Sequence, residues 1–284
     1  MFVVGIYGGL ASQMNQYSFL YLLKQRFPNV DVRMAIGADW RRYMEHNGYE
    51  LDRVFGIRRD GVEWDVVRRL ANFYPGHGLK AKIFNVGFRI RSLIGRLKRT
   101  QITIQPSNKP DWQKLDVNPK EDVLFWSNYS MGFFDEIKDE LRTVFTFKPP
   151  LEGHNAELMS LIRRTNSVSV HVRRGDYAKY KREMLGVEYY EQAFNRIKEQ
   201  VESPKFFIFS DDSDWVEKNL GFINAEEIVR GNLGLTSYVD LQLMAECKHN
   251  IIANSGYSLF ASWLNRNPDK VVISPNDEVS AGEI

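Results

Sequence analysis

The chain has 284 residues, with 38 basic and 36 acidic side chains and a formal net charge of +2. Hydrophobic residues make up 43% and charged residues 26%, an ordinary globular composition that excludes a disordered chain. The one cysteine, Cys247, excludes a disulfide framework and a cysteine-rich zinc site, and it indicates a reducing compartment. A chain of this length is expected to form two domains or one large one.

The first residues predict a strand, a glycine turn and a helix. Residues 1–7 are apolar, Gly8 and Gly9 end that run, and helical spacing follows from Ser12, the predicted N-cap. Residues 2–23 carry no charge, but the polar side chains at their centre would be costly in lipid. A signal peptide's basic start and cleavage site are also missing. We therefore expect a cytoplasmic protein.

A basic block occupies residues 66–110, which contain ten lysines or arginines and no acidic residue. Within it Ile83, Val86, Ile90, Leu93 and Leu97 share one face of a predicted helix, with basic residues on both sides. Two interpretations remain open. The helix packs on the protein's own core, or it lies on an anionic membrane surface.

The second half of the chain predicts strands that alternate with helices. The expected strands are 167–172, 206–209, 250–253 and 270–273, and the expected helices are 189–201, 215–220, 238–246 and 258–264. Thr236 or Ser237 is expected to cap the third of these helices. This alternation predicts an α/β fold with a parallel, doubly wound sheet. The segment 147–153, with two prolines and a glycine, is expected to be a linker.

Three polar loops follow predicted strands at their C-terminal ends, where open α/β sheets bind ligands. His171-Val-Arg-Arg-Gly-Asp-Tyr177 suits a diphosphate, or an internal Arg–Asp salt bridge. Ser210-Asp-Asp-Ser-Asp214 suits a ribose, a base or a divalent cation, or it caps the next helix. Asn254-Ser-Gly-Tyr-Ser258 offers backbone N–H groups to an anion, or it is an ordinary turn.

These loops, together with the first glycine turn, resemble glycosyltransferase family 11, the α-1,2-fucosyltransferases. The matching blocks, in the family's order, are Gly8-Gly-Leu-Ala-Ser-Gln-Met-Asn-Gln-Tyr17, His171-Val-Arg-Arg-Gly-Asp-Tyr177, Phe207-Ile-Phe-Ser-Asp-Asp212 with Trp215, Cys247-Lys-His-Asn-Ile-Ile-Ala-Asn-Ser255 and Trp263-Leu-Asn265. Two blocks depart from the usual pattern. The family's G-G-L-G-N-Q-[ML]-F-Q reads Gly-Gly-Leu-Ala-Ser-Gln-Met-Asn-Gln here, and its N-S-S-F-S-W-W reads Asn-Ser-Gly-Tyr-Ser-Leu-Phe.

The resemblance implies a GT-B-like fold, in which two Rossmann-like domains face a cleft. Residues 1–150 would form the acceptor-side domain and residues 151–284 the domain that binds the GDP-sugar. The implied reaction is inverting transfer of L-fucose from GDP-β-L-fucose to a terminal galactose of a glycan, such as an O-antigen. The family needs no metal or other cofactor, and no nucleic-acid partner is expected.

The resemblance also assigns roles to individual residues. Those expected to bind the donor are Gly8, Gly9, His171, Arg173, Arg174, Asp211, Asp212, Asn254, Ser255 and Gly256. Arg173 would hold the β-phosphate and stabilise the charge that grows on departing GDP. Arg174 would support that motif, and the backbone of residues 254–256 would add donors to the diphosphate. The two glycines would close over it.

Inversion needs a base near the acceptor hydroxyl, and the guanine needs polar partners. Asp176 is the first candidate for the base and Glu183 the second, although Asp176 also suits a role in orienting an arginine. His171 and Asp212 are expected to contact the guanine nucleotide.

Two other functions fit parts of the sequence. A metal-dependent transferase of another nucleotide sugar would use Asp212 and Asp214 as metal ligands. A non-catalytic module would bind a membrane or nucleic acid through the basic block, and its binding would not depend on Arg173.

The membrane interpretation of residues 80–99 is tested by changing Arg89, Arg91, Arg96 and Lys98 together to glutamine. Each basic side chain near an anionic bilayer contributes about 1 kcal/mol, so the quadruple variant should lose most of its binding. Flotation of the full chain with phosphatidylglycerol vesicles measures that loss. Unchanged flotation would exclude the membrane contact.

Overall fold

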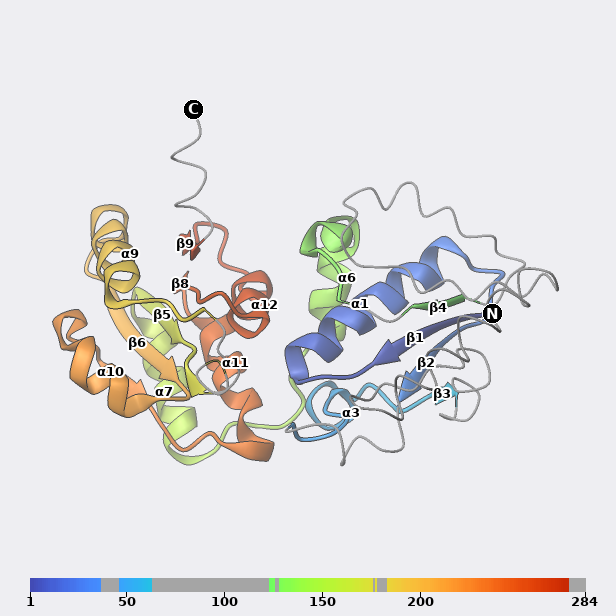
Figure 1. Ribbon diagram of the computed structural model, residues 1–284. Coiled ribbons are helices and arrows are strands. Elements are labelled where there is room, and N and C mark those ends of the chain that lie inside the picture. Colours follow the sequence, from blue (N-terminus) through green and yellow to red (C-terminus); the bar gives the residue numbers. More distant parts are fainter. Residues whose placement is uncertain (37–45, 63–122, 126–127, 176, 178–182, 276–284) are drawn as a thin grey trace. The chain divides into compact units, whose positions relative to one another are not determined.

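The computed structural model describes residues 1–36, 46–62, 123–125, 128–175, 177 and 183–275 (Figure 1). The chain divides into two compact units, Met1–Lys148 and Pro149–Ile284, so the boundary falls inside the segment that was expected to be a linker. The basic helix of residues 80–99 and the candidate base Asp176 lie outside the described residues.

The first unit is a parallel sheet with helices packed on it. Its elements are β1 (Phe2–Ile6), α1 (Leu10–Arg26), β2 (Val32–Ile36), α3 (Leu51–Phe55), β3 (Gly61–Val62), β4 (Val123–Phe125), the 3₁₀ helix η2 (Met131–Ile137) and α6 (Lys138–Val144). The strand order is β3-β2-β1-β4, and Phe2 at the start of β1 pairs with Val32 and Val123. Every residue of β1 is buried, which is why this strand reads as a continuous apolar run.

Helix α1 begins two residues before the predicted N-cap, so the assignment of Ser12 as the cap is wrong. Gly9 is the N-cap, and Gly8 turns the chain with a φ of 85°. A Cβ atom at Gly8 would lie 2.8 Å from the Cβ atom of Ser12, so a side chain there would meet both a clash and a strained backbone. The glycine turn, rather than a serine cap, sets the start of the helix.

The amide side chain of Gln13 on α1 connects three backbone groups of the first unit. Gln13 is 1% exposed. Its amide nitrogen donates to the carbonyls of Gly8 and Gly48, at 2.8 and 2.7 Å, and its oxygen accepts from the backbone N–H of Glu50 at 2.9 Å. One neutral side chain therefore fixes the glycine turn to the loop that precedes α3.

Asn15 and Gln16 of α1 also form hydrogen bonds through their amide side chains, mainly with the segment that follows β4. Asn15 donates to the carbonyl of Tyr129 at 2.8 Å and accepts from its N–H at 2.7 Å. Gln16 accepts from the N–H of Tyr7 at 2.7 Å and donates to the side chain of Asn128 at 3.1 Å. The polar centre of the uncharged N-terminal stretch thus satisfies buried backbone groups, which explains its composition.

The second unit is a five-stranded parallel sheet with helices on both faces. Its elements are α7 (Gly153–Arg164), β5 (Ser167–Val172), α9 (Val187–Gln200), β6 (Lys205–Ser210), α10 (Ser213–Asn219), η3 (Gly221–Ile223), β7 (Glu227–Val229), η4 (Gly234–Thr236), α11 (Tyr238–Glu246), β8 (His249–Ile251), α12 (Gly256–Leu264) and β9 (Val272–Ile273). The strand order is β7-β6-β5-β8-β9. The chain order therefore reverses between β5 and β8, which makes that position the topological switch point.

Helices α9 and α10 cover one face of this sheet, and α11 and α12 lie on the other (Figure 1). Apolar side chains of β5 and β6, including Val170 and Ile208, pack against Tyr190 and Ile197 of α9. The predicted strands and helices of this half are all present, within two or three residues at each end. Helix α7 and the short strand β7 were not predicted.

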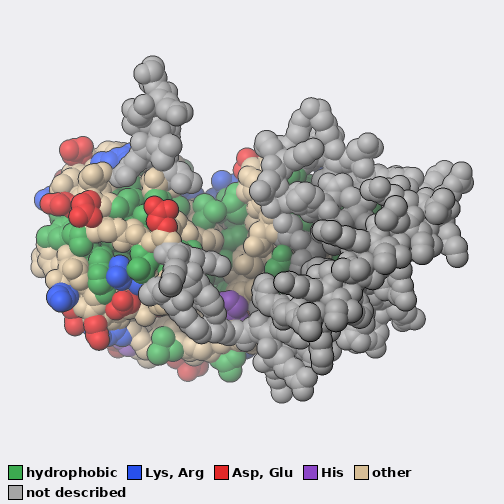
Figure 2. Space-filling model, in the orientation of Figure 1, with side chains coloured by type: hydrophobic (Ala, Val, Ile, Leu, Met, Phe, Trp, Pro, Cys, Tyr) green, Lys and Arg blue, Asp and Glu red, His purple; other side chains and the backbone are tan. Residues whose placement is uncertain are grey.

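Among the residues placed by the structure, no helix combines the length and the apolar character needed to cross a bilayer. On the face drawn in Figure 2, basic and acidic side chains of the second unit are interspersed.

Candidate functional site

The three predicted polar loops all leave the same edge of the second sheet. β5 and β8 pair in parallel with Val170 opposite Ile251, and β5 and β6 pair with Val172 opposite Ser210. Because parallel strands end at one edge, the loops after these three strands start close together. They surround the switch point, where open α/β sheets bind ligands.

Asp211 holds the two adjacent arginines of the first loop. Its Oδ2 lies 2.8 Å from Nη1 of Arg173, and its Oδ1 accepts the backbone N–H of Arg174 at 2.8 Å. The side chains of Arg173 and Asp211 are 28% and 25% exposed, so this ion pair is only partly screened by water. A Cβ atom at Gly175 would lie 3.0 Å from Oδ2 of Asp211, so the small residue lets the two loops approach.

Arg174 is fixed by a second set of contacts. Its guanidinium lies 4.0 Å from the ring centroid of Trp215, and its Nε is 3.4 Å from Oδ2 of Asp212. The other oxygen of Asp212 accepts the backbone N–H of Trp215 at 3.1 Å and so caps α10. The capping interpretation of Asp212 is therefore confirmed, and both of its carboxylate oxygens have partners within the protein.

His171, the last but one residue of β5, is a buried neutral imidazole. It is 5% exposed, and its Nδ1 has no hydrogen-bond partner among the described residues. Burial, and then the positive charge of Arg173, lower its pKa to about 3. A buried ring nitrogen without a partner is uncommon in proteins and indicates capacity for a polar ligand.

The third loop leads into α12 through a serine cap. Ser255 is the N-cap, and its hydroxyl accepts the backbone N–H of Tyr257 at 3.3 Å. The hydroxyl of Ser258 accepts the N–H of Ala253 at 3.1 Å, which fixes the loop from the other side. The start of this nine-residue helix carries the partial positive charge that favours an anion.

Two further residues of the region meet at Asn254. The hydroxyl of Tyr177 donates to the carbonyl of Asn254 at 2.8 Å, and the amide of Asn254 donates to the carbonyl of Glu183 at 2.9 Å. Glu183, the second candidate base, is thus beside the loop through its backbone, while its side chain is exposed.

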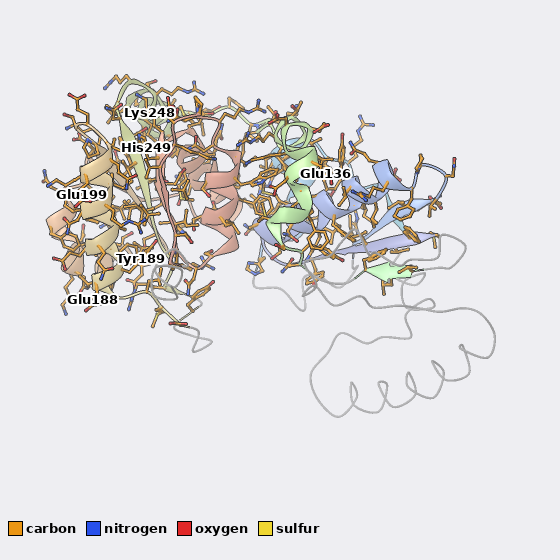
Figure 3. The ribbon with its side chains drawn as sticks, turned by 90° about the horizontal axis from the view of Figure 1, so that it is seen from above. Glu136, Glu188, Tyr189, Glu199, Lys248 and His249 are labelled. Carbon is orange, nitrogen blue, oxygen red and sulfur yellow. The ribbon has the colours of Figure 1, made fainter. Side chains whose placement is uncertain are left out.

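A pair of tyrosines on α9 supports the site, although the sequence predicted them only as the first residues of a helix. The hydroxyl of Tyr189 donates to the carbonyls of Ile252 and Ile273, at 2.5 and 3.2 Å, and that of Tyr190 to the carbonyl of His171 at 3.2 Å. Figure 3 shows Tyr189 at the opposite end of the sheet from His249, the first residue of β8. The two hydroxyls therefore hold the backbone at the C-terminal ends of β5, β8 and β9.

The remaining expected site residues are Gly8 and Gly9, which belong to the first unit at the C-terminal end of β1. Their role in donor binding stays a prediction. Within the ranges that the structure describes, no group of three or more acidic, histidine or cysteine side chains is placed to hold a metal ion.

Comparison with known proteins gives consistent results. Residues 109–282 match the family described as Glycosyl transferase family 11. The chain is 37% identical to the O-antigen biosynthesis glycosyltransferase WbnK of Escherichia coli, over 94% of this chain and 91% of that one. It is 30% identical to an alpha-1,2-colitosyltransferase of Escherichia coli, over 96% and 90%. The crystal structure of the fucosyltransferase NodZ from Bradyrhizobium superposes with a TM-score of 0.51 at 16% identity, covering 92% of this chain and 91% of that one.

The buried imidazole predicts a specific pH dependence of stability. The folded-state pKa of His171, about 3, lies below the usual value of 6.5, so the unfolded chain binds a proton that the folded chain excludes. Stability is therefore lost as the pH falls below 6.5. His171→Leu should remove about 2 kcal/mol of the loss between pH 7 and pH 5, measured by denaturant unfolding at both pH values.

The matched control is His154→Asn. Glu227 raises the pKa of the exposed His154, so this residue contributes at acidic pH and the contribution is lost as the pH rises. Replacing His154 should therefore make the loss of stability at acidic pH steeper. Identical pH profiles for wild type and His171→Leu would contradict the neutral buried state of His171.

Proposed function

Because the chain belongs to glycosyltransferase family 11 and has the GT-B-like fold of two α/β units, we propose that it is an inverting α-1,2-fucosyltransferase. The proposed donor is GDP-β-L-fucose, and the proposed acceptor is a terminal galactose of a bacterial surface glycan such as an O-antigen. The observation that carries the proposal is the Arg173–Asp211 pair beside the start of α12, at the switch point of the second sheet.

The geometry suits stabilisation of a leaving nucleoside diphosphate. In inverting transfer the bond between the sugar and the β-phosphate breaks while the acceptor oxygen attacks, and negative charge grows on GDP. A guanidinium and a helix start that are already in place stabilise that charge without reorganising. Removal of one such donor costs about 3 kcal/mol in the barrier. We propose that Arg173 and the backbone of residues 254–256 supply these donors and that no metal is needed.

The proposed roles of the remaining residues follow from their partners. Arg174 would hold the motif after β5 in place, because Trp215 and Asp212 fix its guanidinium. His171 offers Nδ1 to the guanine base. Asp176 and Glu183 stay the candidate bases for deprotonating the acceptor hydroxyl.

A second donor sugar is favoured by one relative, the alpha-1,2-colitosyltransferase that covers 96% of this chain. Colitose is L-fucose without its 3-hydroxyl group, so the same diphosphate site would serve either donor. The glycan acceptor is proposed to be linked to a lipid at the cytoplasmic face of the inner membrane. The vesicle experiment on residues 80–99 tests the membrane contact that such an acceptor implies.

The nucleotide is tested by thermal unfolding with GDP, UDP and ADP, each with and without EDTA. GDP at about 100 times its dissociation constant should stabilise the folded chain by about 2.7 kcal/mol, and EDTA should not change this. Arg173→Ala should abolish the shift. The control is Arg163→Ala, which removes an exposed arginine of α7 that pairs with Glu246 at 3.0 Å. This variant should keep the thermal shift with GDP.

A shift with UDP, or one that requires a metal, would overturn the proposal in favour of the metal-dependent alternative. No shift with any nucleotide would favour a non-catalytic binding module.

The donor sugar is tested by comparing kcat/KM for GDP-fucose and GDP-colitose with one galactoside acceptor. A site that hydrogen-bonds the 3-hydroxyl should reject the deoxy sugar by about 10⁴-fold, because its polar groups would be left unpaired. We expect GDP-fucose to be preferred. The reverse preference would identify a colitosyltransferase and leave the inverting chemistry unchanged.

A further inference from the structure

Tyr257 lies in the first turn of α12, directly after the loop 254–256 that is proposed to bind the diphosphate. Its ring centroid is 5.8 Å from that of His171. The residue therefore lies between two parts of the proposed donor site.

The hydroxyl of Tyr257 bridges two backbone groups in the first turn of α11. It accepts the N–H of Leu241 at 3.0 Å and donates to the carbonyl of Ser237. Ser237 is the N-cap of α11, and an α-helix joins the carbonyl of residue i to the N–H of residue i+4. The hydroxyl, which can donate and accept at once, thus contacts both members of the pair that opens this helix.

The other end of Tyr257 is tied to the anion loop. Its backbone N–H donates to the hydroxyl of Ser255, the N-cap of α12. One residue therefore connects the start of α12 to the start of α11 through a rigid ring. A phenylalanine would keep the ring packing and lose the α11 contact, because it has no polar atom in the side chain.

We propose that Tyr257 is a positioning residue that holds the loop 254–256 against the start of α11 and so increases the affinity for the donor's diphosphate. The inference rests on the proposed function, because it assigns the loop to the nucleotide. A purely structural role for the hydroxyl would lower stability and leave the affinity of the folded protein unchanged.

The test is Tyr257→Phe in the full chain, with GDP binding measured by titration calorimetry. The dissociation constant should rise about 3- to 10-fold, which corresponds to the net value of one hydrogen bond. The KM for the GDP-sugar should rise by the same factor, and the KM for the acceptor should stay within twofold. The binding stoichiometry reports the folded fraction, so partial unfolding does not obscure the affinity.

Thr165→Val is the matched control. Thr165 donates its hydroxyl to the carbonyl of Leu161 at 2.9 Å, at the C-terminal end of α7 and next to the start of β5. The Thr165→Val variant therefore loses a hydroxyl-to-carbonyl hydrogen bond at the edge of the sheet opposite the site. The melting temperature of this variant should fall, and its affinity for GDP should match that of the wild type.

The outcomes separate the two proposals. If wild type and Tyr257→Phe bind GDP equally, the positioning role is wrong and the proposed function stands. If the KM values for donor and acceptor rise together, the hydroxyl does not act on the diphosphate loop and the inference is also wrong. If the wild type does not bind GDP, the proposed function fails and this inference fails with it.

Discussion

The carboxylate of Asp211 fixes the position of both arginines that follow β5, and the chemistry proposed for the second unit depends on this contact. Without it, two adjacent guanidinium groups would repel each other and sample many rotamers. Asp211 pairs with the side chain of Arg173 and the backbone of Arg174, and Asp212 pairs with the side chain of Arg174. The four side chains together carry no net charge. The arrangement therefore suits recognition of an anion through directed donors rather than through a positive field, in agreement with the chain's net charge of +2.

Directed donors are useful only when the backbone beneath them is rigid, and aromatic side chains supply that rigidity. The guanidinium of Arg174 lies over the ring of Trp215, and the ring of Tyr190 lies edge-on to Trp215 with centroids 6.3 Å apart. The hydroxyls of Tyr189 and Tyr190 donate to backbone carbonyls at the C-terminal ends of the strands and so fix the backbone there. Each ring fills apolar space and satisfies a polar group at its tip.

Much of the second unit could be predicted from the sequence because its signals are local. Alternating or apolar runs identify β5, β6 and β8, and helix α11 was predicted at its observed limits. The polar loops could be placed at one edge because parallel strands end together. The Arg173–Asp211 pair could not be chosen from the sequence, because the loops carry several acidic residues near strand ends. The register between β5 and β6 brings residues 173 and 211 together. The sequence could not identify Tyr189 and Tyr190 as residues that support the site, because hydroxyls that donate to backbone carbonyls leave no spacing pattern in the sequence.

The two units use different chemistry to hold the loops after their central strands. In the first unit Gln13, Asn15 and Gln16 fix backbone groups with neutral amides, whereas in the second unit carboxylates fix arginines. Amides hold the Gly8 turn firmly and add no charge next to it, while an ion pair holds a cation in a fixed place. A charged diphosphate would require such a fixed cation. The contrast is therefore in keeping with the donor role proposed for the second unit.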